Sequence, residues 1–271
     1  MELNNKKFEY VSHKSATHTK NLDMLEILPF SQKHSSYITS SSHQISRSSC
    51  VRDLGVMVDD NLSWKFHIDK VTKACQQLCG WALSVFHTRD RQTLLTIFNS
   101  LIRSKLEYCS EIWHPHLIKE IVKIEQVQRS FTSKIQGMQN INYWDRLREL
   151  GIMSLQRRRE RIIIIHVWKI LFGVYPNTIE LEFKVHSRSG SVRAIIKPLP
   201  KLRGRLLTSF DESFIVKAAK LWNVLPAQLT DISSPESFKN KLNEFLRELP
   251  DRPPLPGYPY TCDNSLSNVC M

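Results

Sequence analysis

Apolar residues recur at intervals of three and four positions from Trp64 onward, and this spacing constrains the fold more than any other feature of the chain. In an α-helix, residues at this spacing share one face, which has to be buried against another part of the protein. The first run predicts a long helix whose apolar face is made of Phe66, Ile68, Val71, Ala74, Cys75, Leu78, Trp81, Ala82, Val85 and Phe86. Comparable runs continue toward the carboxy end, so the sequence predicts a mainly α-helical protein.

The later helices are delimited by residues that typically begin or end a helix. Ser and Asp accept hydrogen bonds from the first free backbone N–H groups, and Gly allows the left-handed turn that closes a helix. The expected helices are 90–106 starting near Asp90, about 116–135 ended by Gly137, 144–150 ended by Gly151, 155–172 capped by Ser154, one capped by Asp211 that ends at Trp222-Asn223, and one opened by Ser234-Pro235-Glu236.

The two ends of the chain have a different character. Residues 1–62 predict short strands and polar loops, with Leu54–Val58 as a buried strand that closes on a turn at Asp59-Asp60-Asn61. The tail from Pro250 carries five prolines and is expected to remain unpacked. The expected parts are strands and a loop over 1–62, a helical domain over 63–183, a basic connector with carboxy-terminal helices over 184–249, and a Pro-rich tail over 250–271.

The charge balance favours a polyanionic partner. The chain has 38 Lys and Arg against 26 Asp and Glu, a net charge of +12. Such a charge is typical of proteins that bind RNA, DNA or an anionic membrane surface, although a merely basic protein has it too. The stretch from Lys184 to Arg205 contains two prolines and no acid, which predicts an extended basic connector.

Arginines at the start of the helix capped by Ser154 are the sharpest functional signal. Guanidinium groups bind phosphate oxygens in pairs, and cations at a helix amino terminus oppose the helix dipole, which favours an outside partner for them. A solvated helix start, or pairing with Glu160, Glu149 or Asp145, would account for the same residues. The residues expected to contact nucleic acid are Arg157, Arg158, Arg159, Arg161, Arg193, Lys197, Lys201, Arg203 and Arg205.

Other segments bear on the cellular location of the protein and on a possible zinc site. The sequence contains no apolar stretch of the roughly 18 residues that a membrane span requires, and its first residues lack the apolar core of a signal peptide. We therefore expect no membrane partner and an intracellular location, either nuclear or cytoplasmic. Cys75 and Cys79 lie one helical turn apart and could supply two zinc ligands, but they fall on the expected apolar face, so burial in the core is favoured.

A series of short motifs occurs in one order along the chain. The motifs are Val51-Arg52-Asp53-Leu54-Gly55-Val56, Leu62-Ser63-Trp64, His67-Ile68, Leu106-Glu107-Tyr108-Cys109-Ser110, Trp113-His114-Pro115, Glu125-x-x-Gln128-Arg129-x-Phe131-Thr132, Tyr143-x-x-Arg146-Leu147, Leu150-Gly151-Ile152-x-Ser154-Leu155, Arg157-Arg158-Arg159-Glu160-Arg161 running on to Trp168-Lys169-Ile170, Leu221-Trp222-Asn223-x-Leu225-Pro226 and Phe238-Lys239-x-x-Leu242. Each is weak alone. Together, over about residues 1–260, they resemble the part of jockey-like non-LTR retrotransposon reverse transcriptases that follows the catalytic palm.

The resemblance implies that the polymerase aspartates precede this chain. Asn5-x-Lys7-Phe8-Glu9 looks like the strand just after the catalytic hairpin, so residues 1–62 would be a β remnant of the palm. Asp59-Asp60 by itself resembles a metal-binding turn, but two-metal chemistry needs a third carboxylate from an earlier strand, and a polar turn explains the pair. Fingers, most of the palm and any endonuclease would be absent. Magnesium would serve the intact parent enzyme, and we expect no cofactor in this chain.

The same resemblance implies a thumb and carboxy-terminal extension that bind template RNA and the primer–template duplex. The expected partners are RNA and DNA, without a small-molecule substrate, and the chain alone should not polymerise. Tyr143 and Trp144, beside Arg146 and Arg148, could stack on bases or pack in the core. Three alternatives stay open: a nucleic-acid-binding protein without enzymatic activity, a non-functional remnant of a decayed element, and helices that dock onto a separately encoded palm.

Overall fold

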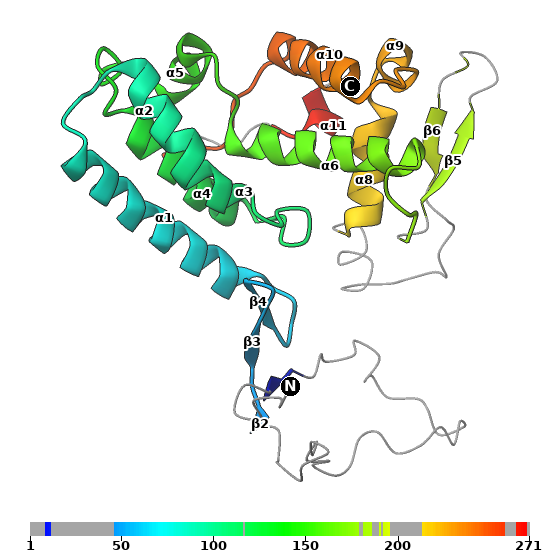
Figure 1. The fold of residues 1–271 in the computed structure, drawn as a ribbon, viewed down its shortest axis with the longest axis horizontal. Helices are drawn as coiled ribbons and strands as arrows, with labels where there is room; N and C mark the ends of the chain where they lie inside the picture. Colours follow the sequence, from blue (N-terminus) through cyan, green and yellow to red (C-terminus); the bar gives the residue numbers. More distant parts are fainter. Residues whose placement is uncertain are drawn as a thin grey trace. The chain divides into compact units, whose positions relative to one another are not determined.

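The structure is a computed structural model that describes residues 9–11, 46–115, 117–178, 181–185, 190, 192–195, 213–257 and 264–269 (Figure 1). These residues are mainly helical, with short strands near the amino end, which confirms the fold class expected from the apolar spacing. No helix in the described ranges is both long enough and apolar enough to cross a membrane. The chain divides into two compact units, Met1–Lys70 and Val71–Met271.

The first unit is built on two short strand pairs. Its strands are β1 (Glu9–Tyr10) parallel to β2 (Ser46–Arg47), and β3 (Cys50–Asp53) antiparallel to β4 (Val56–Asp59). The β3–β4 hairpin turns through Leu54 and Gly55, whose φ angles of 43° and 92° are both positive, as a tight two-residue hairpin turn requires. Leu54 is 84% exposed in this turn, so the expectation that it begins a buried strand is wrong; the strand begins at Val56.

Asp59 organises the end of this hairpin. Its side chain is buried and accepts hydrogen bonds from the Asn61 and Ser63 backbone N–H groups, at 3.0 and 2.9 Å. The Ser63 hydroxyl donates a third bond at 2.6 Å. The carboxylate therefore satisfies the backbone of the turn that leads to the first helix, which is the polar-turn role considered for the Asp59-Asp60 pair.

The second unit contains most of the helices. Its elements are most of α1 (Lys65–Val85), then α2 (Arg91–Ile97), the π-helix η2 (Phe98–Arg103), α3 (Ser104–Glu107), α4 (Ile118–Thr132), α5 (Tyr143–Leu150), α6 (Leu155–Leu171), strands β5 (Glu182–Val185) and β6 (Val192–Ile195), α8 (Phe214–Asn223), α9 (Ala227–Thr230), α10 (Pro235–Glu248) and α11 (Leu266–Val269). The expected starts at Asp90, Ser154 and Ser234 and the stop at Gly151 are confirmed, whereas α4 ends at Thr132 and not at Gly137. Asp211, the expected cap of α8, lies outside the described residues. The Ser154 hydroxyl caps α6 by accepting from the Arg157 N–H at 3.0 Å, and Gly151 closes α5 with a φ of 63°.

Helix α6 is the central element of this unit, with α8, α10 and α11 beside its second half (Figure 1). Ile163, Ile164 and Val167 of α6 are buried in this apolar cluster. Trp168 stacks on Phe238 of α10, with 5.4 Å between ring centroids. The apolar face predicted for this helix therefore forms the main core.

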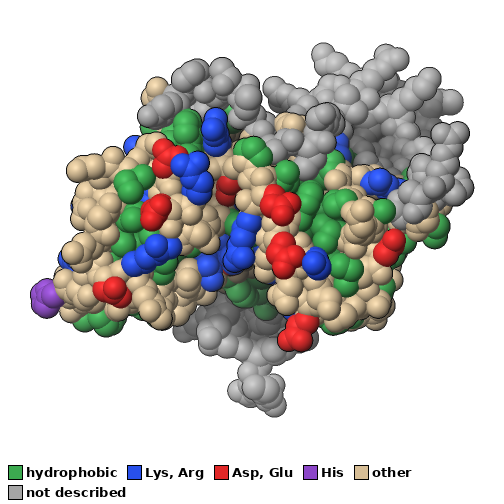
Figure 2. Space-filling model, turned by 90° about the horizontal axis from the view of Figure 1, so that it is seen from above, with side chains coloured by type: hydrophobic (Ala, Val, Ile, Leu, Met, Phe, Trp, Pro, Cys, Tyr) green, Lys and Arg blue, Asp and Glu red, His purple; other side chains and the backbone are tan. Residues whose placement is uncertain are grey.

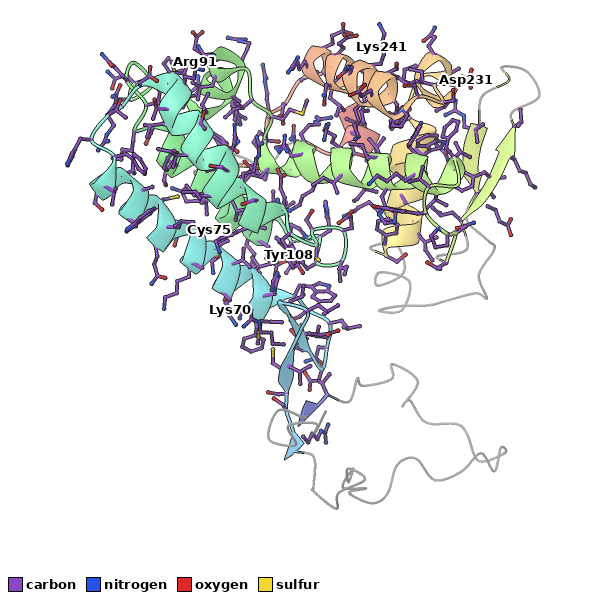
Figure 3. All side chains as sticks on the ribbon, in the orientation of Figure 1. Lys70, Cys75, Arg91, Tyr108, Asp231 and Lys241 are labelled. Atoms are coloured by element: carbon purple, nitrogen blue, oxygen red, sulfur yellow. The ribbon has the colours of Figure 1, made fainter. Side chains whose placement is uncertain are left out.

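The apolar face expected for α1 is only partly buried. Cys75 and Cys79 face inward, and the Cys75 thiol lies 3.8 Å from the Ile102 carbonyl oxygen (Figure 3). Burial raises the pKa of Cys75 to about 11 and that of Cys79 to about 12, so both remain protonated, as the core prediction requires. In the described part of the chain, no three His, Cys, Asp or Glu side chains are placed to hold a metal ion. The expectation of burial is wrong for five exposed residues of this face: Phe66, Ala74, Trp81, Val85 and Phe86.

Part of the expected basic connector is a β-hairpin. Strands β5 and β6 pair antiparallel, with Glu182 opposite Ile195 and Val185 opposite Val192. Asn223, at the end of α8, fixes β6 by accepting from the Ala194 N–H at 3.0 Å and donating to the Ala194 carbonyl at 2.9 Å. The extended conformation is thus stabilised by pairing and by packing on α8.

The described carboxy-terminal residues are packed, so the expectation of an unpacked tail is wrong for them. Leu255 and Leu266 are buried, and the Trp144 indole N–H donates to the Pro253 carbonyl at 2.9 Å. Asp251 accepts from the Ser154 N–H and hydroxyl, both at 2.7 Å. The low apolar content of this segment did not predict its packing, because backbone carbonyl groups and a carboxylate make many of its contacts.

Replacing Asp251 with alanine should destabilise the second unit. The change leaves the Ser154 N–H and hydroxyl without this acceptor in a largely buried place, which costs about 1–3 kcal/mol in the free energy of unfolding. Urea denaturation followed by circular dichroism measures it. Asp231→Ala, at an exposed acid after α9, is the matched control and should change stability by less than about 0.5 kcal/mol. Equal stability of the two variants would contradict the packing of this segment.

Candidate nucleic-acid interface

The four arginines at the start of α6 fall into two groups. Arg157 and Arg159 are 0% and 2% exposed, whereas Arg158 and Arg161 line a pocket. Residues three apart lie on the same side of a helix, so Arg158 and Arg161 share a side. All four arginines lie on one helix, as the sequence pattern predicts. The packing around the helix buries two of them and leaves the other two lining a pocket.

Arg157 holds the carboxy-terminal segment. One guanidinium nitrogen, Nη2, donates to the Pro250 carbonyl at 3.0 Å and to the Asn264 carbonyl at 3.2 Å. Glu160, on the next turn of the helix, accepts from the Leu266 N–H at 3.1 and 3.2 Å through its two carboxylate oxygens. Both side chains therefore bond to the backbone of the segment that follows α10.

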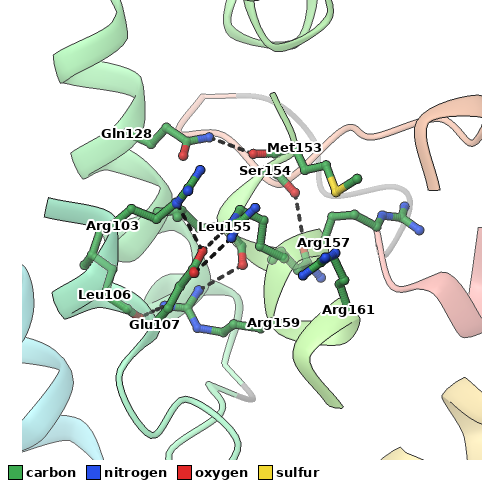
Figure 4. A network of polar contacts seen from close by, with 12 residues as sticks. Arg103, Leu106, Glu107, Gln128, Met153, Ser154, Leu155, Arg157, Arg159 and Arg161 are labelled. Atoms are coloured by element: carbon green, nitrogen blue, oxygen red, sulfur yellow. Dashed lines mark hydrogen bonds and ion pairs between the residues drawn. The ribbon is translucent and has the colours of Figure 1, made fainter. Parts of the chain in front are cut away.

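Arg159 is enclosed on another side of the helix (Figure 4). Its guanidinium donates to the Leu155 carbonyl at 3.3 Å and to the Leu106 carbonyl at 3.2 Å. It also lies 5.1 Å from the centroid of the Trp113 ring, within the range of a cation–π contact. Burial lowers the pKa of Arg159 to about 10, so the group remains charged near neutral pH.

These placements correct the expectation that Arg157 and Arg159 contact a phosphate backbone. A buried guanidinium that bonds to carbonyl groups of the same chain does not present its nitrogens to an outside ligand. The partners of these two cations at the helix amino terminus are carbonyl groups of the protein itself.

Arg158 and Arg161 belong to a pocket of about 400 Å³ that we call the arginine pocket. Residues 151–153, between α5 and α6, form one wall. The polar residues that line it are Asn99, Arg103, Arg158, Arg161, Asn243 and Arg247. They come from η2, α6 and α10, and none of the described lining residues is acidic.

Glu107 partly balances the charge of the pocket. It pairs with the Arg158 guanidinium, including a bond of 3.0 Å between Nη2 and Oε2, and lies 3.8 Å from the Arg103 Nε (Figure 4). The Arg161 Nε donates to the Asn243 Oδ1 at 2.6 Å. Two of the four guanidinium groups therefore share one carboxylate, which leaves the pocket positively charged.

The arginines of the pocket disfavour one another's charge. Burial, followed by the charge of Arg158, lowers the pKa of both Arg103 and Arg161. Guanidinium groups still remain charged near neutral pH, so the positive potential is kept and an anion in the pocket would relieve the repulsion. On the face seen in Figure 2, Lys and Arg side chains lie in the middle with Asp and Glu side chains beside them. The arrangement can bind a phosphate group.

Of the basic residues expected in the connector, Arg193 is described, and it does not line this pocket. Arg193 lies on β6, is half-buried, and donates to the Asn223 carbonyl. The other four expected residues lie outside the described residues: Lys197, Lys201, Arg203 and Arg205.

Sequence reasoning missed Arg103, Arg247, Asn99 and Asn243. Each lies on a helix that is separated from the Arg158 region by about 50 to 90 positions in the sequence. The local sequence contains no signal that distinguishes Arg247 from other solvent-facing cations of α10. Only the packing of η2, α6 and α10 around one space brings these residues together.

Comparisons with known proteins add a relative of undescribed function. No family model and no solved structure matches the chain. Over 128 residues the chain is 25% identical to uncharacterized protein B0403.1 of Caenorhabditis elegans. The matched region makes up 46% of this chain and 65% of that protein. The chain therefore spans slightly less than two thirds of that relative's length.

The buried glutamates should make stability depend on pH. Burial raises the pKa of Glu125 and of Glu160 to about 7, from an ordinary value of 4.5. Because each group holds its proton more tightly in the folded than in the unfolded chain, the free energy of unfolding should fall as pH rises from 4.5 to about 7 and then level off. Urea denaturation between about pH 5 and 8 measures this.

Glu160→Gln should flatten that dependence, because the amide cannot lose a proton. Glu236→Gln, at an exposed position in the first turn of α10, is the control and should leave the slope unchanged. A Glu160→Gln variant with the slope of the unaltered protein would show that Glu160 titrates alike in the folded and unfolded chains.

Pyrophosphate should stabilise the folded chain through the arginine pocket. A ligand that binds only the folded state raises the free energy of unfolding, by about 2.7 kcal/mol at 100 times its Kd. The expected result is a higher Tm in pyrophosphate than in sodium chloride of equal ionic strength. Arg247→Gln should reduce this increase, and Lys239→Gln, at an exposed position on the same helix, should not. An equal increase in both variants would place the anion elsewhere.

Proposed function

We propose that this chain is the post-palm, carboxy-terminal part of a non-LTR retrotransposon reverse transcriptase, and that it binds template RNA and the primer–template duplex without polymerising on its own. The ordered motifs are the basis for the family, and the net charge of +12 agrees with a nucleic-acid partner. The arginine pocket carries the binding proposal, because it concentrates four guanidinium groups around one space.

The pocket suits a backbone phosphate. Guanidinium groups donate to phosphate oxygens in pairs, and the amide groups of Asn99 and Asn243 can add further donors. Such contacts position a strand without reading its bases, so binding is expected to tolerate many sequences. Each phosphate neutralised releases counterions, which makes the affinity fall as the salt concentration rises.

Residues of two separate motifs bond to one another in the second unit, and one of them also bonds to the backbone between α5 and α6. Tyr143 donates to Glu125 at 2.7 Å, and the Gln128 amide donates to the Tyr143 hydroxyl at 3.1 Å and to the Met153 carbonyl at 3.0 Å. The Arg146 guanidinium donates to the Arg129 carbonyl at 2.8 Å. These motif residues support one arrangement of α4, α5 and α6, which gives a physical reason for the motifs to occur as a set.

The proposal assigns no polymerase chemistry to Asp59-Asp60. The Asp59 carboxylate already accepts three hydrogen bonds from the turn that follows β4. In the proposed parent enzyme, the metal-binding carboxylates belong to the palm, and this chain contributes contacts to the nucleic acid.

A double variant at the pocket should weaken RNA binding. Arg161→Gln with Arg247→Gln removes two charges that line the pocket and leaves the Arg158–Glu107 pair intact. We expect an affinity for single-stranded RNA at least about tenfold lower, because each charge-assisted hydrogen bond contributes roughly a kcal/mol or more. The slope of log affinity against log salt should shrink by about 0.7 for each phosphate that the variant no longer neutralises. Fluorescence anisotropy between about 50 and 200 mM salt measures both.

The matched control is Lys220→Gln with Lys239→Gln. Both lysines are exposed, on α8 and α10, and neither lines the pocket. Because the two double variants have the same net charge, general attraction to RNA is equal in both. If they bind RNA equally, the pocket is not the interface; if the unaltered protein binds no RNA, the proposed function fails.

A further inference from the structure

A second pocket of about 460 Å³ lies beside the arginine pocket. It is formed by α5, the connection between α5 and α6, the end of α10 and the segment after α10. Its apolar lining includes Trp144, Leu147, Ile152 and Leu249. We call it the tryptophan pocket, because Trp144 offers the one indole ring among its described lining residues.

The two pockets share a wall. Gly151, Ile152, Met153 and Arg247 line both of them. A ligand with an anionic part and a flat apolar part, joined by a short linker, could therefore place one part in each pocket. A nucleotide has this composition, with a phosphate and a base joined through a sugar.

Trp144 is held in a fixed orientation at the tryptophan pocket. Its indole N–H donates to the Pro253 carbonyl at 2.9 Å, and its ring is half-buried. The guanidinium of Arg252, an exposed residue, lies 6.0 Å from the centroid of the ring. Arg252 thus covers a ring face and can move aside toward solvent. Aromatic rings and guanidinium planes are the groups on which proteins stack unpaired bases.

Tyr143, the neighbouring aromatic residue, is not available in the same way. It is 2% exposed and its hydroxyl is bonded to Glu125 and Gln128. Of the two aromatic residues considered at this place for base stacking, the structure puts Tyr143 in the core and Trp144 at the pocket.

We infer that the tryptophan pocket receives an unpaired nucleobase, which stacks on Trp144 while an adjoining phosphate occupies the arginine pocket. This inference rests on the proposed function and deepens it. A base inside a duplex is paired and stacked on its neighbours, so the site selects single-stranded or unpaired nucleotides. The polar lining consists of charged side chains of both signs: Asp145, Glu248 and Asp251 beside Arg148, Arg247 and Arg252. Because stacking uses the ring face that every base has, binding depends on the presence of a base more than on its identity.

The experiment compares two oligomers of equal length and charge, oligothymidylate and a fully abasic deoxyribose phosphate chain. Fluorescence anisotropy should show that the unaltered protein binds oligothymidylate about tenfold more tightly, the range expected for stacking of a base on an aromatic ring. Trp144→Ala should abolish this difference and leave the affinity for the abasic chain unchanged. Trp144→Phe, which keeps a ring, should retain most of it. Arg161→Gln with Arg247→Gln should weaken binding of both oligomers.

The outcomes separate the two proposals. If neither oligomer nor RNA binds the unaltered protein, the proposed function fails. Equal binding of the two oligomers by the unaltered protein overturns the inference and leaves the proposed function standing, and this comparison needs no variant to fold. If Trp144→Ala weakens the binding of both oligomers alike, the role of Trp144 is purely structural, and this result also overturns the inference.

Discussion

The burial of charged residues in the first turns of α6 is the constraint on which the second unit depends. Arg157, Arg159 and Glu160 are each at most 3% exposed. A buried charge costs several kcal/mol unless it is paired and hydrogen-bonded, so each of these groups requires partners at fixed places. The partners of the two arginines come from distant parts of the chain. They are the Leu106 carbonyl at the end of α3, the ring of Trp113, and the carbonyl groups of Pro250 and Asn264. The helix thus determines which segments lie around it.

The buried bonds of Arg157, Arg159 and Glu160 also fix the side of α6 that lines the arginine pocket. With its other sides held by buried bonds, α6 presents Arg158 and Arg161 in a defined position opposite η2 and α10. Glu107 and Asn243 further restrict the two guanidinium groups. A phosphate that enters the arginine pocket therefore meets donors whose freedom is already reduced, which lowers the entropic cost of binding.

Much of the fold follows from local sequence, and less of the site does. Helix spacing, the Ser154 cap and the Gly151 stop depend on neighbouring residues, and the structure has them as expected. The packed carboxy-terminal segment was not predictable, because its contacts use carbonyl groups that every residue possesses. Of the arginine run, Arg158 and Arg161 line the pocket, whereas Arg157 and Arg159 are buried. Arg103 and Arg247 could not be identified, since only the tertiary packing of helices far apart in sequence places them together.

The bonds between α6 and the carboxy-terminal segment have a consequence for the order of events during synthesis. Arg157 and Glu160 are made roughly a hundred residues before Asn264 and Leu266, the partners of their buried groups. Until those late residues leave the ribosome, Arg157 and Glu160 in the first turns of α6 lack these buried partners. A nascent chain would thus have all the residues that line the arginine pocket before it has these buried supports of α6. Under the proposed function, a strand of RNA would meet a fully supported pocket only after residues 264–266 have been made.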